Sequence, residues 1–201
     1  MFILLRLVQK CGNSFLQALS ERLTFGIFCG IIILPRERDK SEFVEVIFLL
    51  ELVKFEEKYR QSFIDFNTDW IVSNFGFLEE HDKETFEKID EELNNGAMIF
   101  FAVENEIPLA CCMTTPMENT TWEICKLGSN KNVPHKGAGN LVFKASMDWA
   151  LDHGAKRLFI ISNKKLKPAL HIYEKNGFKE IKLDDYEYVR GDIAFEYITE
   201  E

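Results

Sequence analysis

The sequence predicts an α/β domain in which strands and helices alternate along most of the chain. Residues 121–129 form a β-branched, aromatic and apolar run of strand length, and a glycine turn and an amphipathic helix follow at once. Residues 157–162 are continuously apolar, which suits a strand buried on both faces and covered by helices on both sides. Hydrophobic residues make up 46% of the 201 residues, which is ample for a core.

The first half of the domain is expected to contain a strand and two helices. We expect the strand over residues 45–54 and a helix over residues 56–74, which a Phe-Gly-Phe sequence then ends. A second helix is expected over residues 84–93, with Asp82 as its N-cap and the Asn-Asn-Gly run at 94–96 as its end. The apolar residues at helical spacing in the first helix are Tyr59, Phe63, Phe66 and Trp70.

The second half is expected to follow the order strand, strand, strand, helix, strand, helix, strand, strand. Residues 97–104 and 107–117 read as a hairpin that turns at Asn105-Glu106. The helices are expected over residues 141–153 and 166–175, each ended by a glycine (Gly154 and Gly177). Residues 187–199 supply the closing strand.

The glycine turn between the strand and the first of these helices predicts a phosphate-binding site. Its sequence is Pro134-His135-Lys136-Gly137-Ala138-Gly139, and free N–H groups at a helix N-terminus attract anions. The turn lacks the Gly-Lys-Ser/Thr ending of a nucleotide-triphosphate loop, and Val142 breaks the dinucleotide fingerprint. Both of those nucleotide sites are therefore disfavoured, and a plain turn without ligand is the alternative.

A second motif gives the turn a family context. The segment Ala169-Leu170-His171-Ile172-Tyr173-Glu174-Lys175-Asn176-Gly177-Phe178, together with Gly137 and Gly139, resembles the signatures of the GNAT superfamily of acyl-CoA-dependent N-acyltransferases. The chain departs from the family pattern at Pro134, where Gln or Arg is usual. The resemblance spans roughly residues 46–197 and is strongest over residues 123–178. It implies a mixed, twisted β-sheet that splays after its fourth strand, with helices on both faces.

The resemblance also implies acetyl-CoA as the acyl-donor substrate and a set of residues that hold it. Its pantetheine arm would lie along Leu127, Gly128 and Ser129, and the N–H of Leu127 would stabilise the oxyanion. Asn163 is a candidate for the pantetheine amides, and Pro134 is expected to weaken the binding without abolishing it. The pyrophosphate would be held by the N–H groups of His135, Lys136, Gly137, Ala138, Gly139 and Asn140.

Two residues are candidates for the proton transfers that amine acetylation requires. Glu123 lies eleven residues before Pro134, where several members of the family carry a catalytic base, and it alternates with Cys125 and Leu127 along the strand. The alternative is that Glu123 is an exposed strand residue or a partner of Lys126 or another lysine, in which case water chains would accept the proton. Tyr173 is the candidate acid for the leaving thiolate, and the alternative is an aromatic residue that packs on the sheet.

The expected activity is acetyl transfer to a primary amine of a small molecule or peptide, by direct attack in a ternary complex. A noncatalytic CoA-binding module on the same fold is the alternative, and a membrane-tethered enzyme is a third possibility. The run Glu79-Glu80-His81-Asp82 would border the acceptor pocket, as an electrostatic guide for the amine or as a solvated loop. Trp70, Phe75 and Phe77 would form the wall of that pocket or belong to the core.

Charge and cysteine content restrict the partners and the location. The net charge of −9 argues against nucleic-acid binding and weakly favours a cationic acceptor. The five cysteines show no metal-ligand spacing, so no metal is expected, and reduced thiols indicate a cytoplasmic protein. A homodimer is left open.

The N-terminal residues 1–43 do not fit the predicted domain over residues 44–201. Residues 1–40 carry six Lys/Arg and three Asp/Glu, a balance of +3 in an acidic chain. The apolar run over residues 25–34 is shorter than the roughly 20 residues that span a bilayer. We favour upstream sequence translated from a wrong start codon over a packed extra element or a membrane-associating arm.

Overall fold

The computed structural model describes residues 32–34, 45–47, 50–184, 186 and 189–199, and the chain divides into two units, Met1–Glu51 and Leu52–Glu201. In the first unit, β1 (Ile32–Leu34) pairs antiparallel with β2 (Glu45–Ile47). The strand expected over residues 45–54 is therefore wrong as a single element, because β2 and β3 (Glu51–Lys54) belong to different sheets. Our interpretations of residues 1–31, including Cys11 and Cys29, lie outside the described residues.

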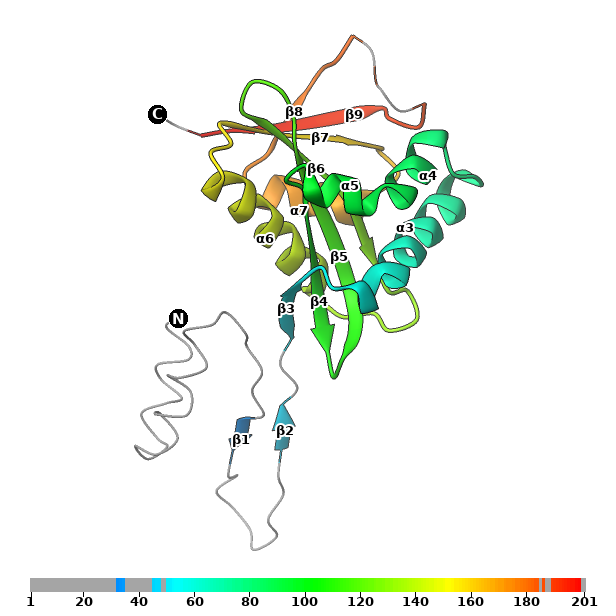
Figure 1. Ribbon diagram of the computed structural model, residues 1–201, viewed down its shortest axis with the longest axis vertical. Helices are drawn as coiled ribbons and strands as arrows, with labels where there is room; N and C mark the ends of the chain where they lie inside the picture. The colour runs from blue at the N-terminus through cyan, green and yellow to red at the C-terminus, as the bar shows by residue number, and fades with distance from the viewer. Residues whose placement is uncertain (1–31, 35–44, 48–49, 185, 187–188, 200–201) are drawn as a thin grey trace, which may run out of the picture. The chain divides into compact units, whose positions relative to one another are not determined.

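The second unit is built on one mixed sheet (Figure 1). Among the described residues, its strand order is β3-β4-β5-β6-β7-β9-β8. Neighbouring strands from β4 onward are antiparallel, except that β6 and β7 run parallel. The strands are β4 (Met98–Glu104), β5 (Ile107–Pro116), β6 (Thr121–Ser129), β7 (Arg157–Ser162), β8 (Lys179–Ile181) and β9 (Ile193–Ile198).

The hairpin of β4 and β5 turns where the sequence predicts. Asn105 and Glu106 have φ values of 51° and 65°, so both central residues of the turn are left-handed. Such a turn matches the right-handed twist of the flanking strands, and asparagine tolerates this conformation well. The predicted hairpin is confirmed.

The helices begin and end close to the predicted positions, with one correction. α3 (Arg60–Phe75) follows a short 3-10 helix (Glu57–Tyr59), α6 is Ala138–Asp152 and α7 is Lys167–Lys175. The helix expected over residues 84–93 is instead two, α4 (Glu80–Glu87) and α5 (Ile89–Asn94), separated at Lys88.

Asp82 is not the N-cap of α4. Glu79 is the N-cap, with extended backbone angles, and Asp82 occupies the third helical position. The backbone N–H of Glu79 donates to the Asp82 carboxylate at 3.1 Å, which completes a capping box. The prediction failed because acidic residues at both positions suit a helix N-terminus, so the composition did not decide between them.

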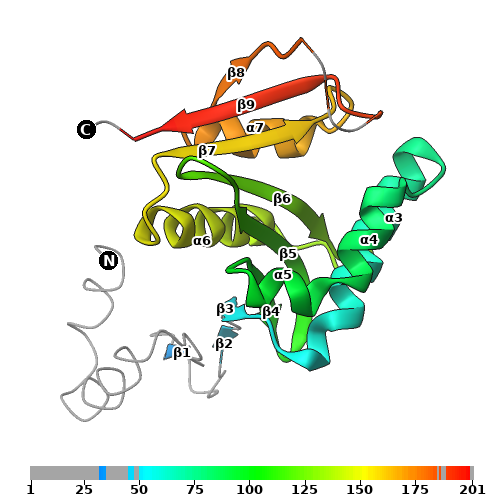
Figure 2. The ribbon, with the colours of Figure 1, turned by 45° about the horizontal axis from the view of Figure 1, so that its top comes forward.

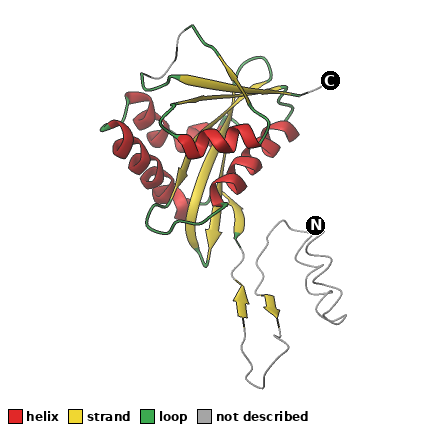
Figure 3. Cartoon of the chain, turned by 180° about the vertical axis from the view of Figure 1, so that it is seen from behind, coloured by secondary structure: helices red, strands yellow, loops and turns green. Residues whose placement is uncertain are grey.

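The sheet is covered on both faces, as the apolar strand over residues 157–162 predicts. Successive β4 residues point in opposite directions. Phe101 contacts Tyr59 with ring centroids 5.1 Å apart, in the cluster beside α3 and α5, whereas Phe100 contacts Trp149 of α6 at 6.1 Å. Seen from behind and coloured by secondary structure, helices flank the strands of this unit (Figure 3).

The sheet opens between its two parallel strands. β6 and β7 pair only from Thr121 to Glu123, against Arg157 to Phe159. Beyond these pairs the strands diverge (Figure 2), which leaves the backbone of the second half of β6 without a partner strand on that side. The predicted splay is present, and it creates the cleft in which the candidate site lies.

Candidate active site

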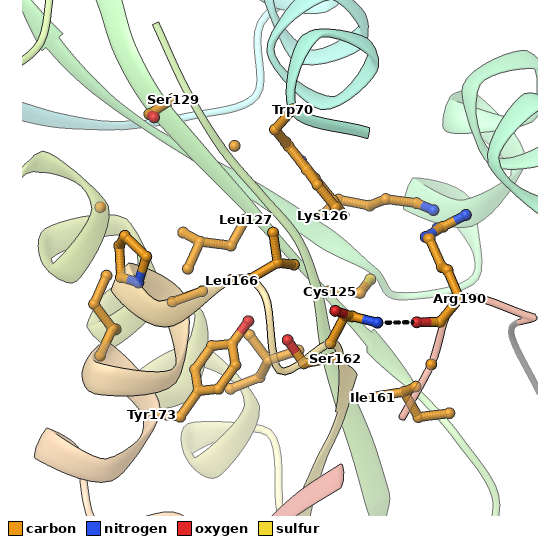
Figure 4. A pocket seen from close by; sticks show the side chains of 18 of the residues that line it. Trp70, Cys125, Lys126, Leu127, Ser129, Ile161, Ser162, Leu166, Tyr173 and Arg190 are labelled. Carbon is orange, nitrogen blue, oxygen red and sulfur yellow. Dashed lines mark hydrogen bonds between the residues drawn. The ribbon is translucent and has the colours of Figure 1, made fainter. Parts of the chain in front are cut away.

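The cleft between the splayed strands is a cavity of about 240 Å³. One wall is the stretch of β6 from Glu123 to Ser129, which includes four of the residues that the sequence assigns to the reaction. Tyr173 and Asn163 line the opposite wall. The remaining lining residues that matter here are Trp70, Phe75, Lys126, Ser162 and Arg190, most of which Figure 4 labels.

A second cavity, of about 450 Å³, lies at the N-terminus of α6. Its lining contains all six residues from His135 to Asn140 that were predicted to hold a pyrophosphate. It also contains Lys131, Lys136 and Lys175 but no Asp or Glu, in a chain whose net charge is −9. Ser129 and Gly139 line both cavities, so the two cavities adjoin at these residues.

The backbone at the start of α6 has N–H groups that precede the helical hydrogen bonds. Gly137 is the N-cap of α6 with φ of 101°, and the helix has no side-chain cap. The first intrahelical bond runs from the N–H of Leu141 to the carbonyl of Gly137 at 3.0 Å. The N–H groups of Gly139 and Asn140 precede that ladder and carry the positive end of the helix dipole. α6 thus begins at Ala138 rather than at the predicted residue 141, because the left-handed glycine lets the loop turn directly into the helix.

A bulge in β6 changes which residues share a face. Met113 of β5 pairs with Cys125, but Cys111 pairs with Gly128, so the register shifts between them, and Lys126 has φ of 51°. Glu123, Cys125 and Gly128 therefore face α3, and Leu127 points to the other face. The predicted alternation of Glu123 with Cys125 and Leu127 is wrong at Leu127, because a β-bulge adds one residue to the strand.

Gly128 is required by packing as well as by its place in the cleft. A Cβ added there would lie 3.1 Å from the Cβ of Phe66 and 3.2 Å from its carbonyl carbon. Because α3 is this close, a side chain at position 128 would push the helix away from β6.

Tyr173 points its phenol into the cleft beside the Ser162 hydroxyl (Figure 4). Its ring packs against Phe143 and Phe195, with centroids 5.4 and 5.5 Å apart, so the ring is held firmly. Burial raises the pKa of Tyr173, which Ser162 offsets only in part. The phenol therefore stays protonated at neutral pH and can donate a hydrogen bond to a developing thiolate. The Oγ of Ser162 has no hydrogen-bonding partner among the described residues.

Glu123 and Cys125 are half-buried neighbours on the same face of β6. Burial raises the pKa of the Cys125 thiol well above its usual range, and the nearby charge of Glu123 adds to this effect. A thiol in that state is a poor nucleophile. Cys125 is therefore not suited to forming an acyl-enzyme, although it lines the cleft.

A comparison of the sequence with family models identifies the family. A sequence model of the Acetyltransferase (GNAT) family matches residues 59–178, which is more than half of the chain. The chain belongs to the GNAT acetyltransferase family. No curated protein matches it.

Solved GNAT structures share the fold at low identity. An acetyltransferase of the GNAT family from Staphylococcus aureus Mu50 has a TM-score of 0.67 and 16% identity, over 75% of this chain and 99% of that one. The ribosomal-protein-alanine N-acetyltransferase from Brucella melitensis has a TM-score of 0.60 and 10% identity, over 74% and 99%. The PaiA N-acetyltransferase from Thermoplasma acidophilum, solved in complex with coenzyme A, has a TM-score of 0.58 and 14% identity, over 75% of this chain and 99% of that one.

Asn163 lies in the GNAT cleft, but its amide is already engaged. Its Nδ2 donates to the carbonyl of Arg190 at 2.6 Å, the dashed line in Figure 4. Its Oδ1 accepts from the N–H of Lys165 at 2.9 Å. The side chain thus fixes two loops at the edge of the cleft, and one N–H and one lone pair of its amide remain for the predicted bonds to pantetheine amides, which stay a prediction.

The acidic run at the N-terminus of α4 is neither a free guide for an amine nor a wholly solvated loop. Asp82 is fully buried and Glu79 is bonded to Arg190, whereas Glu80 is exposed and pairs with Lys83 at 2.9 Å. Of the aromatic residues nearby, Trp70 and Phe75 line the cleft. Phe77 is 60% exposed and does not line it.

The sequence did not predict a role in the site for Lys126 and Arg190, which also line the cleft. Both bond to Asp82, Lys126 through Nζ at 2.7 Å and Arg190 through two guanidinium nitrogens at 2.6 and 2.7 Å. Burial by itself would raise the pKa of Asp82, but the Arg190 hydrogen bonds and the Lys126 charge outweigh it and lower the pKa. A lysine in the middle of an apolar strand was the one available signal, since a buried lysine needs a partner.

Among the described residues, no helix combines the length and the apolar character that crossing a membrane requires. The same part of the chain holds no group of three or more His, Cys, Asp or Glu placed to bind a metal ion.

Proposed function

We propose that this protein transfers the acetyl group of acetyl-CoA to a primary amine of a small molecule or a peptide. The observation that carries the proposal is a pair of adjoining cavities with different chemical character. A lysine-lined cavity with free helix N–H groups suits the phosphates of the donor. It adjoins a narrow cleft with a protonated phenol and a carboxylate, which suits the thioester and the amine.

The donor would bind along the open edge of β6. Its phosphates would accept hydrogen bonds from the N–H groups at the start of α6, and its arm would pair with the β6 backbone that β7 leaves free. The bulge at Lys126 turns the next peptide out of the regular ladder, which supports the assignment of the Leu127 N–H to the thioester carbonyl.

The reaction would proceed by direct attack of the amine on the thioester carbon. The amine loses one proton, the C–N bond forms, the C–S bond breaks and the sulfur leaves with the electron pair and takes up a proton. Glu123 would accept the proton of the amine, directly or through water, and Tyr173 would donate to the sulfur. The inert Cys125 thiol supports direct transfer without an acyl-enzyme.

The acceptor would enter from the end that Trp70, Phe75 and Arg190 line. Because the ion pairs of Asp82 with Lys126 and Arg190 balance charge at this end, the aromatic surface of Trp70 and Phe75 is the main feature of its wall. We also propose a cytoplasmic location, which the free thiols of Cys111, Cys112 and Cys125 support.

Binding and turnover with acetyl-CoA test the proposal. At about 100 times its dissociation constant, acetyl-CoA should stabilise the protein by roughly 2.7 kcal/mol in thermal unfolding, with ATP as the control. Release of CoA in the presence of an amine panel should then follow. No stabilisation at millimolar acetyl-CoA would reject the donor site, and binding without turnover would favour a noncatalytic CoA-binding module.

The role of Glu123 is tested by Glu123→Gln, with Glu118→Gln in the exposed turn before β6 as the matched control. Loss of a general base should lower kcat/KM about 100-fold and remove the fall in rate at acidic pH. Glu118→Gln should match the wild type. An active Glu123→Gln variant with an unchanged pH profile would assign the proton transfer to water.

A further inference from the structure

Lys126 combines two features that ordinary strand residues lack. It has φ of 51° inside β6, whereas the other described non-glycine residues with positive φ lie in the two turns at 105–106 and 119–120. Its side chain is also only 5% exposed. The left-handed conformation crowds Cβ against the carbonyl oxygen, so it persists only where surrounding contacts enforce it.

The contact that enforces it is an ion pair with a carboxylate that has no exposure of its own. The Nζ of Lys126 donates to Oδ1 of Asp82 at 2.7 Å, and the side chain of Asp82 is 0% exposed. The ammonium also lies 5.8 Å from the ring centroid of Phe86. Releasing the lysine would leave a buried charge with less compensation, so the pair pulls the strand into its bulged form.

Asp82 is in turn immobilised by other elements. Arg190 donates to both of its oxygens, at 2.6 and 2.7 Å, and the N–H of Glu79 donates to Oδ2 at 3.1 Å. Glu79 accepts from the N–H of Arg190 at 3.1 Å and lies 3.2 Å from its guanidinium. Two acidic and two basic side chains thus balance, and the carboxylate is a fixed point that joins α4, β6 and the loop before β9.

The bulge that this pair holds is the feature that orients the next peptide. Cys125 is in register with Met113, Gly128 with Cys111, and Leu127 lies between them without a partner in β5. The position of the Leu127 N–H relative to the cleft is therefore set by the backbone angles of Lys126. In a regular strand without the bulge, Leu127 would lie on the face that packs against α3, and its N–H would be shifted by one position.

We propose that Asp82 and Lys126 are positioning residues for acetyl transfer, because their buried ion pair holds the β6 bulge that aims the Leu127 N–H at the thioester carbonyl. The inference rests on the proposed function, since it assigns a task to the oxyanion site of that reaction. It adds two residues that do not touch the substrate and would act through the backbone.

The test compares Lys126→Gly with Lys126→Ala. Both variants lose the ammonium and therefore the ion pair, and they differ only in how readily position 126 adopts a positive φ. In an ordinary strand, glycine is less stabilising than alanine. If the ion pair serves to hold the bulge, glycine should instead be the better replacement at position 126. We then expect kcat of Lys126→Gly to exceed that of Lys126→Ala about tenfold.

Three further measurements make the comparison specific. Thermal unfolding should place Lys126→Gly above Lys126→Ala, whereas Lys179→Gly should fall below Lys179→Ala, because Lys179 is an exposed residue of β8 without positive φ. The dissociation constant of acetyl-CoA should change less than about threefold in both Lys126 variants, since the phosphate end is built from α6. Asp82→Asn should lower kcat more than it raises the KM for acetyl-CoA.

The outcomes separate the inference from the proposed function. A wild-type protein that binds acetyl-CoA but transfers nothing to any amine would reject the proposed function and this inference together. An active wild type in which Lys126→Gly has the same or a lower kcat than Lys126→Ala would overturn the inference alone. Equal melting temperatures of the two variants would overturn it as well, because the bulge would then need no enforcement.

Discussion

The phosphate end and the acceptor end of the cleft are built in different ways. The cavity proposed to hold the phosphates is centred on one contiguous stretch, residues 134–140, to which Lys131 and Lys175 add charge, and it uses mostly backbone N–H groups at the start of α6. The acceptor end joins Asp82 of α4, Lys126 of β6 and Arg190 of the loop before β9. Lys126 is 44 residues and Arg190 is 108 residues from Asp82 in the sequence. One end is local in sequence and the other exists only in the folded chain.

This difference determines how each end fails. A backbone site depends on the conformation of single residues, so a substitution acts through φ and through the few atoms nearby. A buried side-chain network depends on every partner, so removing one member leaves the others desolvated and unpaired. We therefore expect larger effects at the acceptor end.

The largest expected effect is on stability, from Asp82→Asn. Loss of the charge leaves Lys126 and Arg190 undercompensated, and we expect the free energy of unfolding to fall by about 3 kcal/mol at pH 7. Because the pKa of Asp82 is lowered in the folded state, its contribution is present above the unfolded value of about 3.9 and is lost as the pH falls below it. Urea unfolding from pH 7 to pH 3 should show the two proteins converging in acid. A constant difference over that range would exclude the carboxylate as the cause.

The next effect is on the chemical step, from Tyr173→Phe. The substitution keeps the packing against Phe143 and Phe195 and removes only the hydroxyl. We expect kcat to fall about 100-fold, because the leaving thiolate loses its hydrogen-bond donor. Steady-state kinetics measure this, with calorimetric titration of acetyl-CoA to check that binding is retained. If kcat of the variant lies within threefold of the wild-type value, Tyr173 only packs on the sheet and does not donate to the thiolate.

At the phosphate end, we expect a smaller effect from Gly137→Ala. No atom lies within 4 Å of the added Cβ, so the cost comes from φ of 101° and amounts to about 1–2 kcal/mol in the free energy of unfolding. Gly139→Ala is the matched variant, because Gly139 has no positive φ and its added Cβ would meet only Ile172 at 3.4 Å. Thermal unfolding should rank the second variant at or above the wild type. Equal losses in both would mean that conformation is not the cause.

The smallest effect expected is from Lys136→Ala, at the rim of the phosphate cavity. We expect the affinity for acetyl-CoA to fall by about threefold to fivefold at low salt, as for other exposed charge pairs. The loss should disappear near 1 M salt, where the Debye length is about 3 Å. Lys144→Ala is the control, since Lys144 pairs with Asp148 at 2.9 Å on α6 and lines neither cavity. A salt-independent loss would indicate a packing role for Lys136.

The elements that the sequence predicted well are those with local causes. The hairpin turn at Asn105-Glu106 follows from the residues of the turn itself, since asparagine tolerates positive φ. The errors have the opposite origin. The bulge at Lys126 reverses the face on which Leu127 lies. The sequence of β6 does not predict this bulge, because the partner of Lys126 is Asp82 of α4.

The sequence by itself thus determined most of the order of elements and the two covered faces of the sheet, and it predicts an anion site at α6, because periodicity and backbone preference act over a few residues. Only the tertiary structure decided at which residue β6 and β7 separate, that the Asn163 amide bonds to two loops, and that Asp82, Lys126 and Arg190 form one buried network. Those features depend on contacts between residues far apart in the chain, and burial determines which of their charges must be paired.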